Sequence, residues 1–150
     1  MYEVFGEMST AAEINAVARS LKEEKELDNL KVLAKENGIE EVFAEMFYEG
    51  EIPYLTDDSM AAVAKLEAEA KELDSQVASA VSAYLQGRCD DIEFARAVRK
   101  NGKSLKTFYE DTIKRLREEA RKKKKNAVCM EYPRKKLFRE AEEYYMEGRR

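Results

Sequence analysis

Three pairs of adjacent acidic residues are the side chains of this sequence best suited to chemistry: Glu40-Glu41, Asp57-Asp58 and Asp90-Asp91. Paired carboxylates can bind Mg²⁺ or transfer protons. Each pair falls where a helix is expected to begin, and an acidic side chain there interacts favourably with the helix dipole. The sequence shows no partners converging on any pair. We therefore interpret the pairs as helix-start signals and expect neither catalysis nor metal binding from them.

Other signatures of catalysis are missing from the chain. It contains no histidine, which is the commonest general base near neutral pH and the commonest ligand of transition metals. No glycine-rich loop of the phosphate-binding type occurs. Cys89 and Cys129 stand far apart and have no histidine partner, so we expect two reduced thiols rather than a metal pair, a disulfide framework or a nucleophile. These features predict a protein that is not an enzyme and that uses no cofactor.

Charge is distributed unevenly along the sequence. Residues 1–75 carry 7 basic and 19 acidic side chains, a net charge of −12, whereas residues 76–150 carry 20 and 12, a net charge of +8. This separation need not indicate a binding function. An acidic lobe packed beside a basic one is simply attracted to it, and each exposed ion pair contributes little stability. Separated lobes would instead create two binding surfaces of opposite sign.

The basic half suggests a site for nucleic acid. Lysine and arginine contacts neutralise phosphates, and the turn at residues 101–104 (NGKS) between two expected helices is similar to the turn of a helix-turn-helix. The alternative is a solvated helix face. The candidate nucleic-acid-binding residues are Lys103, Lys106, Arg121, Lys122, Lys123, Lys124 and Lys125.

The acidic half suggests a second kind of site, one that docks onto a basic protein surface that normally holds nucleic acid. Electrostatic complementarity would speed and orient such docking. Here too the alternative is a solvated helix face. The candidate partner-binding residues are Glu40, Glu41, Glu45, Tyr48, Glu49 and Tyr54.

The elements that must position these residues are helices. Apolar residues make up 44% of the chain and charged residues 39%, with only six Gly and two Pro, which is a composition typical of helical domains. We therefore predict an all-α fold, an irregular bundle of about six or seven helices. It forms a single domain over residues 1–150, in which an acidic lobe at 1–55 and a basic lobe at 88–150 can be distinguished.

Capping signals and glycines predict where most of the helices begin and end. Residues 10–13 (TAAE) and 90–93 (DDIE) form capping boxes, and Ser104 is suited to cap another helix start. Gly38 and Gly50 are suited to left-handed positions after the last turn of a helix. The expected helices are one starting after Thr10, then 28–37, 39–49, 57–86, about 92–98, one starting after Ser104, and one starting at Pro133.

The helix expected over residues 57–86 would be the spine that joins the two lobes. Apolar residues recur in it every three or four positions from Met60 to Tyr84, and its length would be roughly 45 Å. The near-heptad spacing is also compatible with a homodimer through this helix, and we leave that alternative open.

No run of roughly 20 apolar residues occurs, and the first residues lack a basic region followed by an apolar stretch. We expect a cytoplasmic protein that has no membrane partner.

Four segments together resemble small proteins carried by phages, plasmids and conjugative elements of gut Firmicutes. These segments are residues 9–15 (STAAEIN), 33–39 (LAKENGI), 60–67 (MAAVAKLE) and 97–105 (AVRKNGKSL). That group includes anti-CRISPR inhibitors of type II effector nucleases. The segment from residue 127 to residue 148 also resembles the end of accessory proteins of conjugative elements.

The resemblance implies a stoichiometric inhibitor that binds a CRISPR effector nuclease, alone or with its guide RNA or DNA, and blocks DNA loading or cleavage. It assigns no residues, so the acidic and basic candidates above depend on the charge distribution alone. The alternative function is a DNA-binding accessory or regulatory protein of a mobile element.

Overall fold

The computed structural model describes residues 4–122 and 133–147, which form eight α-helices and no β-strand. The all-α class is therefore confirmed for this part of the chain. In chain order the helices are α1 (Ala11–Glu23), α2 (Leu27–Glu36), α3 (Glu41–Tyr48), α4 (Asp58–Leu73), α5 (Gln76–Gly87), α6 (Ile92–Arg99), α7 (Leu105–Lys122) and α8 (Arg134–Met146).

Local signals determine most of the helix ends, as predicted. The hydroxyl of Thr10 accepts a 3.1 Å hydrogen bond from the backbone N–H of Glu13 at the start of α1. Ser104 caps α7 in the same way by accepting from Thr107 at 3.1 Å. After α2 and α3 the chain turns through Gly38 and Gly50, whose φ angles are +72° and +82°. Glycine adopts such left-handed angles without steric cost.

One capping residue differs from the prediction by one position. The box at residues 90–93 was expected to begin with Asp90, but the N-cap of α6 is Asp91. Its carboxylate accepts from the backbone N–H groups of Glu93 at 3.0 Å and Phe94 at 3.4 Å. With Asp91 as the N-cap, the third residue of the helix is Phe94, which cannot complete a capping box. Asp91 therefore caps α6 alone, and Asp90 stays outside the helix.

The single long helix predicted over residues 57–86 is wrong, because the chain breaks between α4 and α5. Asp74 adopts a left-handed conformation with φ +46°, and the hydroxyl of Ser75 accepts from the backbone N–H of Ala78 at 3.3 Å to begin a new helix. Asp and Ser favour turns and caps because their short polar side chains bond to nearby backbone groups. The apolar spacing continues through this break, which is why periodicity alone did not reveal it.

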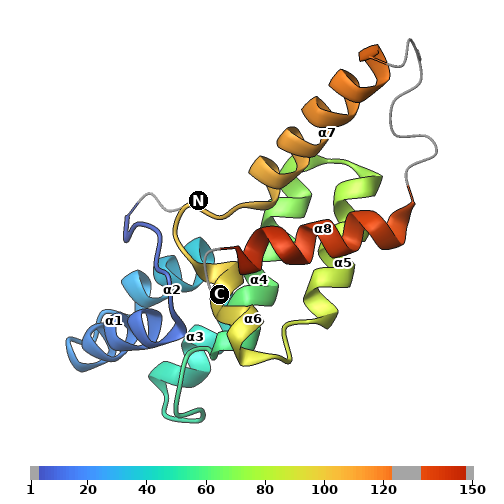
Figure 1. The fold of residues 1–150 in the computed structure, drawn as a ribbon. Helices are drawn as coiled ribbons and strands as arrows, with labels where there is room; N and C mark the ends of the chain where they lie inside the picture. Colours follow the sequence, from blue (N-terminus) through green and yellow to red (C-terminus); the bar gives the residue numbers. More distant parts are fainter. Residues whose placement is uncertain (1–3, 123–132, 148–150) are drawn as a thin grey trace.

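The two halves of that predicted helix pack against each other instead of forming one spine (Figure 1). The hydroxyl of Ser82 on α5 donates a 3.0 Å hydrogen bond to the carbonyl oxygen of Leu66 on α4. The near-heptad stripe thus serves an intramolecular contact. The helix through which a homodimer was considered does not form as one element.

The buried apolar side chains fall into two clusters. The first cluster lies mainly among α1, α2 and α3, and it includes Ile14, Leu21, Leu30, Leu33, Phe47 and Leu55. The second lies among α4 to α8, and it includes Leu66, Leu85, Phe94, Val98, Leu105, Phe108 and Tyr145. Helix α4 contributes to both clusters, through Ala61 in the first and Leu66 in the second, and so holds them together.

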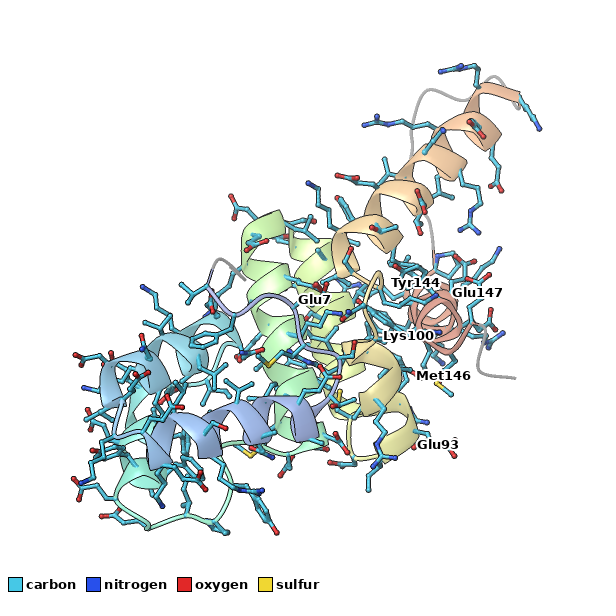
Figure 2. All side chains as sticks on the ribbon, turned by 90° about the vertical axis from the view of Figure 1, so that its left-hand side faces the viewer. Glu7, Glu93, Lys100, Tyr144, Met146 and Glu147 are labelled. Carbon is cyan, nitrogen blue, oxygen red and sulfur yellow. The ribbon has the colours of Figure 1, made fainter. Side chains whose placement is uncertain are left out.

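The acidic helices α1, α2 and α3 and the outer end of α7 lie at opposite ends of the molecule. Both views place α1, α2 and α3 at one end, while α7 runs out from the body at the opposite end (Figures 1 and 2). The first turns of α7 pack on the core through Leu105 and Phe108, which are buried. Its last turns carry the exposed cations Arg121 and Lys122. Between these ends the two halves of the sequence meet, because α4 packs against α5, α6 and α7.

Candidate binding surfaces

Helix α3 gathers most of the predicted acidic site on one exposed side. Glu41, Glu45 and Glu49 follow one another at intervals of four residues, and this spacing places side chains on the same helix face. Glu40 precedes the helix as its N-cap residue and is exposed as well. The exposed residue Val42 adds an apolar contact beside these carboxylates. The structure thus brings together the four glutamates that the sequence singled out.

The opposite side of α3 fixes this orientation. Ala44 and Phe47 are buried in the first apolar cluster, so Glu41, Glu45 and Glu49 on the other side of the helix face outward. The backbone N–H of Ile39 donates to the carbonyl oxygen of Ala34 at 2.8 Å, which ties the start of α3 to α2. Among these glutamates, Glu45 lies 3.3 Å from the ammonium of Lys31, on α2.

The two tyrosines of the predicted acidic site lie in different environments. Tyr48 is half-buried against the first apolar cluster and so contributes to packing. Tyr54 follows α3 in the connection to α4, and 60% of it is exposed. A partner docking on this end could therefore contact the ring of Tyr54 more fully than that of Tyr48.

Lys103, predicted to bind nucleic acid, is held by contacts inside the protein. Its ammonium donates a 2.9 Å hydrogen bond to the carbonyl oxygen of Tyr144 and lies 4.5 Å from the centre of that ring. The carboxylate of Glu147 is 3.8 Å away. Figure 2 shows Tyr144 and Glu147 at the end of α8, next to the α6–α7 connection. These contacts fasten α8 to the start of α7.

The other predicted basic residues that the structure describes, Lys106, Arg121 and Lys122, do not form a single cluster with Lys103. Lys106 lies on the first turn of α7, 4.0 Å from Glu110, whereas Arg121 and Lys122 lie at the other end of that helix. Fifteen residues of helix from Lys106 to Arg121 correspond to about 22 Å. Lys123, Lys124 and Lys125 lie outside the described residues. Arg121 and Lys122 at the exposed end of α7 are thus the described core of the predicted nucleic-acid site.

Two buried cations, which sequence reasoning did not single out, lie where the two apolar clusters meet. The ammonium of Lys65 donates to the carbonyl oxygens of Val98 and Lys103, both at 2.7 Å, and lies 3.8 Å from the carboxylate of Glu7. Burial lowers the pKa of Lys65. Arg99 is 2% exposed and donates from Nη2 to other backbone and side-chain oxygens. The bonds of both cations join separate elements of the fold, so their role is structural, although Nε of Arg99 has no hydrogen-bond partner among the described residues.

A carboxylate close to Lys65 is also perturbed. Glu69 accepts a 3.1 Å hydrogen bond from the backbone N–H of Leu105, and burial raises the pKa of its carboxyl group. Glu36 accepts from the backbone N–H groups of Val4 and Phe5, which fixes the entering chain on α2. Both carboxylates accept hydrogen bonds from backbone N–H groups of other segments, which gives them a structural role.

Among the groups first considered for chemistry, Asp57, Asp58 and Asp91 have structural partners. Asp57 caps α4 by accepting from the backbone N–H of Met60 at 2.8 Å, and Asp58 pairs with Arg96 at 3.0 Å. Burial raises the pKa of the Cys89 thiol to about 11, which leaves it protonated at neutral pH. Across residues 4–122 and 133–147, no group of three or more His, Cys, Asp or Glu side chains is arranged to hold a metal ion.

Among the described helices, none has a stretch both long and apolar enough to cross a bilayer. Comparison of the chain with protein-family models, with curated proteins and with solved structures finds no match.

Proposed function

We propose that this protein is a non-enzymatic inhibitor that acts in the bacterial cytoplasm by binding a type II CRISPR effector nuclease or its guide-RNA complex. The acidic face of α3 docks on a basic surface of the nuclease that would otherwise hold DNA. The observation that supports this proposal is the alignment of Glu41, Glu45 and Glu49 on one exposed side of α3, with the exposed Glu40 directly before the helix. The family resemblance of the sequence supplies the identity of the partner.

The surroundings of α3 favour docking over simple solvation. Residues 11–51 carry 11 acidic and 5 basic side chains, a net charge of −6, and the exposed cations of α7 lie at the far end of the molecule (Figure 1). The cations at the end of α7 therefore do not neutralise the negative field of this end. Such a field attracts a cationic surface and accelerates association at low ionic strength.

The test is to mix purified protein with a type II nuclease, its guide RNA and target DNA. Near-equimolar protein should stop cleavage. The variant Glu40→Lys/Glu41→Lys/Glu45→Lys/Glu49→Lys should lose at least about tenfold in affinity for the nuclease, because each reversal replaces an attraction by a repulsion.

A matched control reverses four exposed glutamates on other helices: Glu72, Glu93, Glu118 and Glu119. This variant has the same net charge as the α3 variant and should still inhibit. Equal affinity of both variants, with unchanged circular dichroism, would exclude docking through α3. Absence of inhibition by the wild-type protein at a large excess would exclude the nuclease as the partner.

A second candidate function is that of a DNA-binding accessory protein of a mobile element. The exposed cations at the end of α7 favour it, because this helix extends away from the body and carries Lys114, Arg117, Arg121 and Lys122. Plain duplex DNA should then be retarded in a salt-sensitive manner. Replacement of residues 121–125 by alanine should weaken the retardation, and identical mobility of wild type and variant at low salt would remove this function.

A further inference from the structure

A shallow groove lies beside the acidic face, between the start of α3, the first half of α4 and the α5–α6 turn. It has a volume of about 290 Å³ and is lined mainly by apolar atoms. Its floor contains Ile39, Phe43, Met60 and Val63. Met60 is 45% exposed although it is large and apolar. A flexible thioether at an open apolar surface adapts readily to the side chains of a partner.

The walls of this groove are fixed by close contacts within the protein. On one side, a Cβ placed on Gly38 would lie 3.1 Å from the carbonyl oxygen of Ala64, so the α2–α3 turn sits directly on α4. On the other side, the hydroxyl of Ser59 donates a hydrogen bond to the carbonyl oxygen of Cys89, which ties α4 to the α5–α6 turn. A preformed groove costs less to order when a ligand binds.

The rim of the groove is acidic. Glu40, Glu67 and Asp90 line it and are exposed, and no Lys or Arg is among its described lining residues. Within the described part of the chain, none of these three carboxylates makes an ion pair or a side-chain hydrogen bond. They are therefore free to meet external cations. The same charges repel phosphates and acidic peptides.

We propose that this groove binds a basic amphipathic segment of a partner protein. Apolar side chains of that segment enter between Phe43, Met60 and Val63, and its flanking Lys or Arg residues meet Glu67 and Asp90. The inference rests on the proposed function in one respect: the basic segment belongs to the same cationic partner that docks on α3. Charge complementarity selects this occupant over nucleic acid, and the apolar floor selects it over a purely basic peptide.

The experiment measures fluorescence anisotropy of a labelled peptide of Lys-Leu-Leu-Lys repeats, titrated with the full chain at low salt. The wild-type protein should bind this peptide and should not bind the matched peptide of Glu-Leu-Leu-Glu repeats. The variant Glu67→Lys/Asp90→Lys should bind the basic peptide roughly tenfold more weakly. The variant Glu23→Lys/Glu24→Lys has the same net charge, carries its changes at the end of α1 and should bind like the wild type.

The apolar floor is tested separately. Met60→Gln should weaken binding about threefold, whereas Val77→Gln, an equally exposed site at the distant start of α5, should have no effect. Failure of the wild type to bind the basic peptide, or equal loss in the two charge-reversal variants, would overturn the proposal. So would a dimer in light scattering that Met60→Gln dissociates, because a second copy would then occupy the groove.

This assay contains no nuclease, and its variants leave the residues of α3 unchanged. Peptide binding that depends on Glu67 and Asp90, without inhibition of a nuclease, would support the groove and reject the proposed function. Inhibition that depends on α3, without peptide binding, would support the proposed function and reject the groove.

Discussion

The guanidinium of Arg99 donates a 2.7 Å hydrogen bond from Nη2 to the carbonyl oxygen of Met8, 91 residues earlier in the chain. The same nitrogen donates to Oδ1 of Asn37 at 3.0 Å. Asn37 in turn donates from Nδ2 to the carbonyl oxygen of Leu33 at 2.9 Å. One buried cation thus joins α6 to the entering chain and to the end of α2.

Replacement of Arg99 should therefore destabilise the whole protein. Arg99→Met would leave the oxygens of Met8 and Asn37 buried without a donor, and the free energy of unfolding should fall by about 2 to 3 kcal/mol in urea titrations. Arg96→Met is the control, because Arg96 forms an exposed pair with Asp58 and should cost less than about 1 kcal/mol. Equal losses in the two variants would contradict the structural role of Arg99.

The turn at Gly38 should not tolerate a side chain. Its φ is +72°, and a Cβ added there would lie 3.1 Å from the carbonyl oxygen of Ala64, so Gly38→Ala should lose about 2 kcal/mol of stability. Gly102 also has a positive φ, +88°, but a Cβ added there would meet no other atom. Gly102→Ala therefore measures the cost of the backbone conformation alone, and its loss of stability should be smaller than that of Gly38→Ala. Gly87→Ala lies within α5 in open space and should instead gain up to about 1 kcal/mol. Thermal unfolding of all three variants checks the order.

The carboxyl group of Glu69 should make stability depend on pH. Burial raises its pKa above the ordinary 4.5, despite the opposing effects of the Leu105 N–H bond and Lys65, and Glu7 and Glu72 also raise it. The folded state therefore holds this proton more tightly than the unfolded state does. The resulting stabilisation is complete below the unfolded pKa and is lost as pH rises through the folded pKa.

Glu69→Gln retains an acceptor for the Leu105 N–H but cannot ionise. The stability of this variant relative to wild type should therefore be greater at about pH 7 than at about pH 4, as measured by urea unfolding at each pH. Glu72→Gln, which changes an exposed residue on the same helix, should show a smaller change. A difference between Glu69→Gln and wild type that stays constant over this range would contradict the predicted shift.

The break between α4 and α5 should depend on its cap. Ser75→Ala removes the acceptor for the Ala78 N–H and should cost about 1 kcal/mol. Ser79→Ala, at an exposed position inside α5, should cost nothing or stabilise slightly, because alanine favours helix interiors. Urea unfolding of both variants distinguishes the two cases. A loss for Ser79→Ala as large as that for Ser75→Ala would show that the cap contributes no specific stability.

Features of the fold that depend on a few neighbouring residues could be predicted from the sequence. Thr10, Ser104, Gly38 and Gly50 mark helix ends by local chemistry, and their roles are confirmed. The acidic face of α3 follows from the spacing of its glutamates once the helix is placed. Its use as a binding site remains a prediction.

Features that depend on distant parts of the chain could not be predicted. Lys65 and Arg99 read as ordinary charged residues on helices. The packing of α4 and α6 against each other, together with the chain before α1 and the end of α2, buries them. Lys103 read as a phosphate ligand, but the end of α8 brings Tyr144 to its ammonium. At Asp74 the local turn signal conflicted with an apolar repeat that continues on both sides, and tertiary packing favoured the turn.

The negative groups of α1 to α3 and the cations of α7 lie toward opposite ends of the molecule and give it an electric dipole moment along its length (Figure 1). A molecule of this kind experiences a torque near a charged surface and turns its acidic end toward a cationic target before contact. Its rate of association should therefore decrease with ionic strength more steeply than a net charge of −4 would produce.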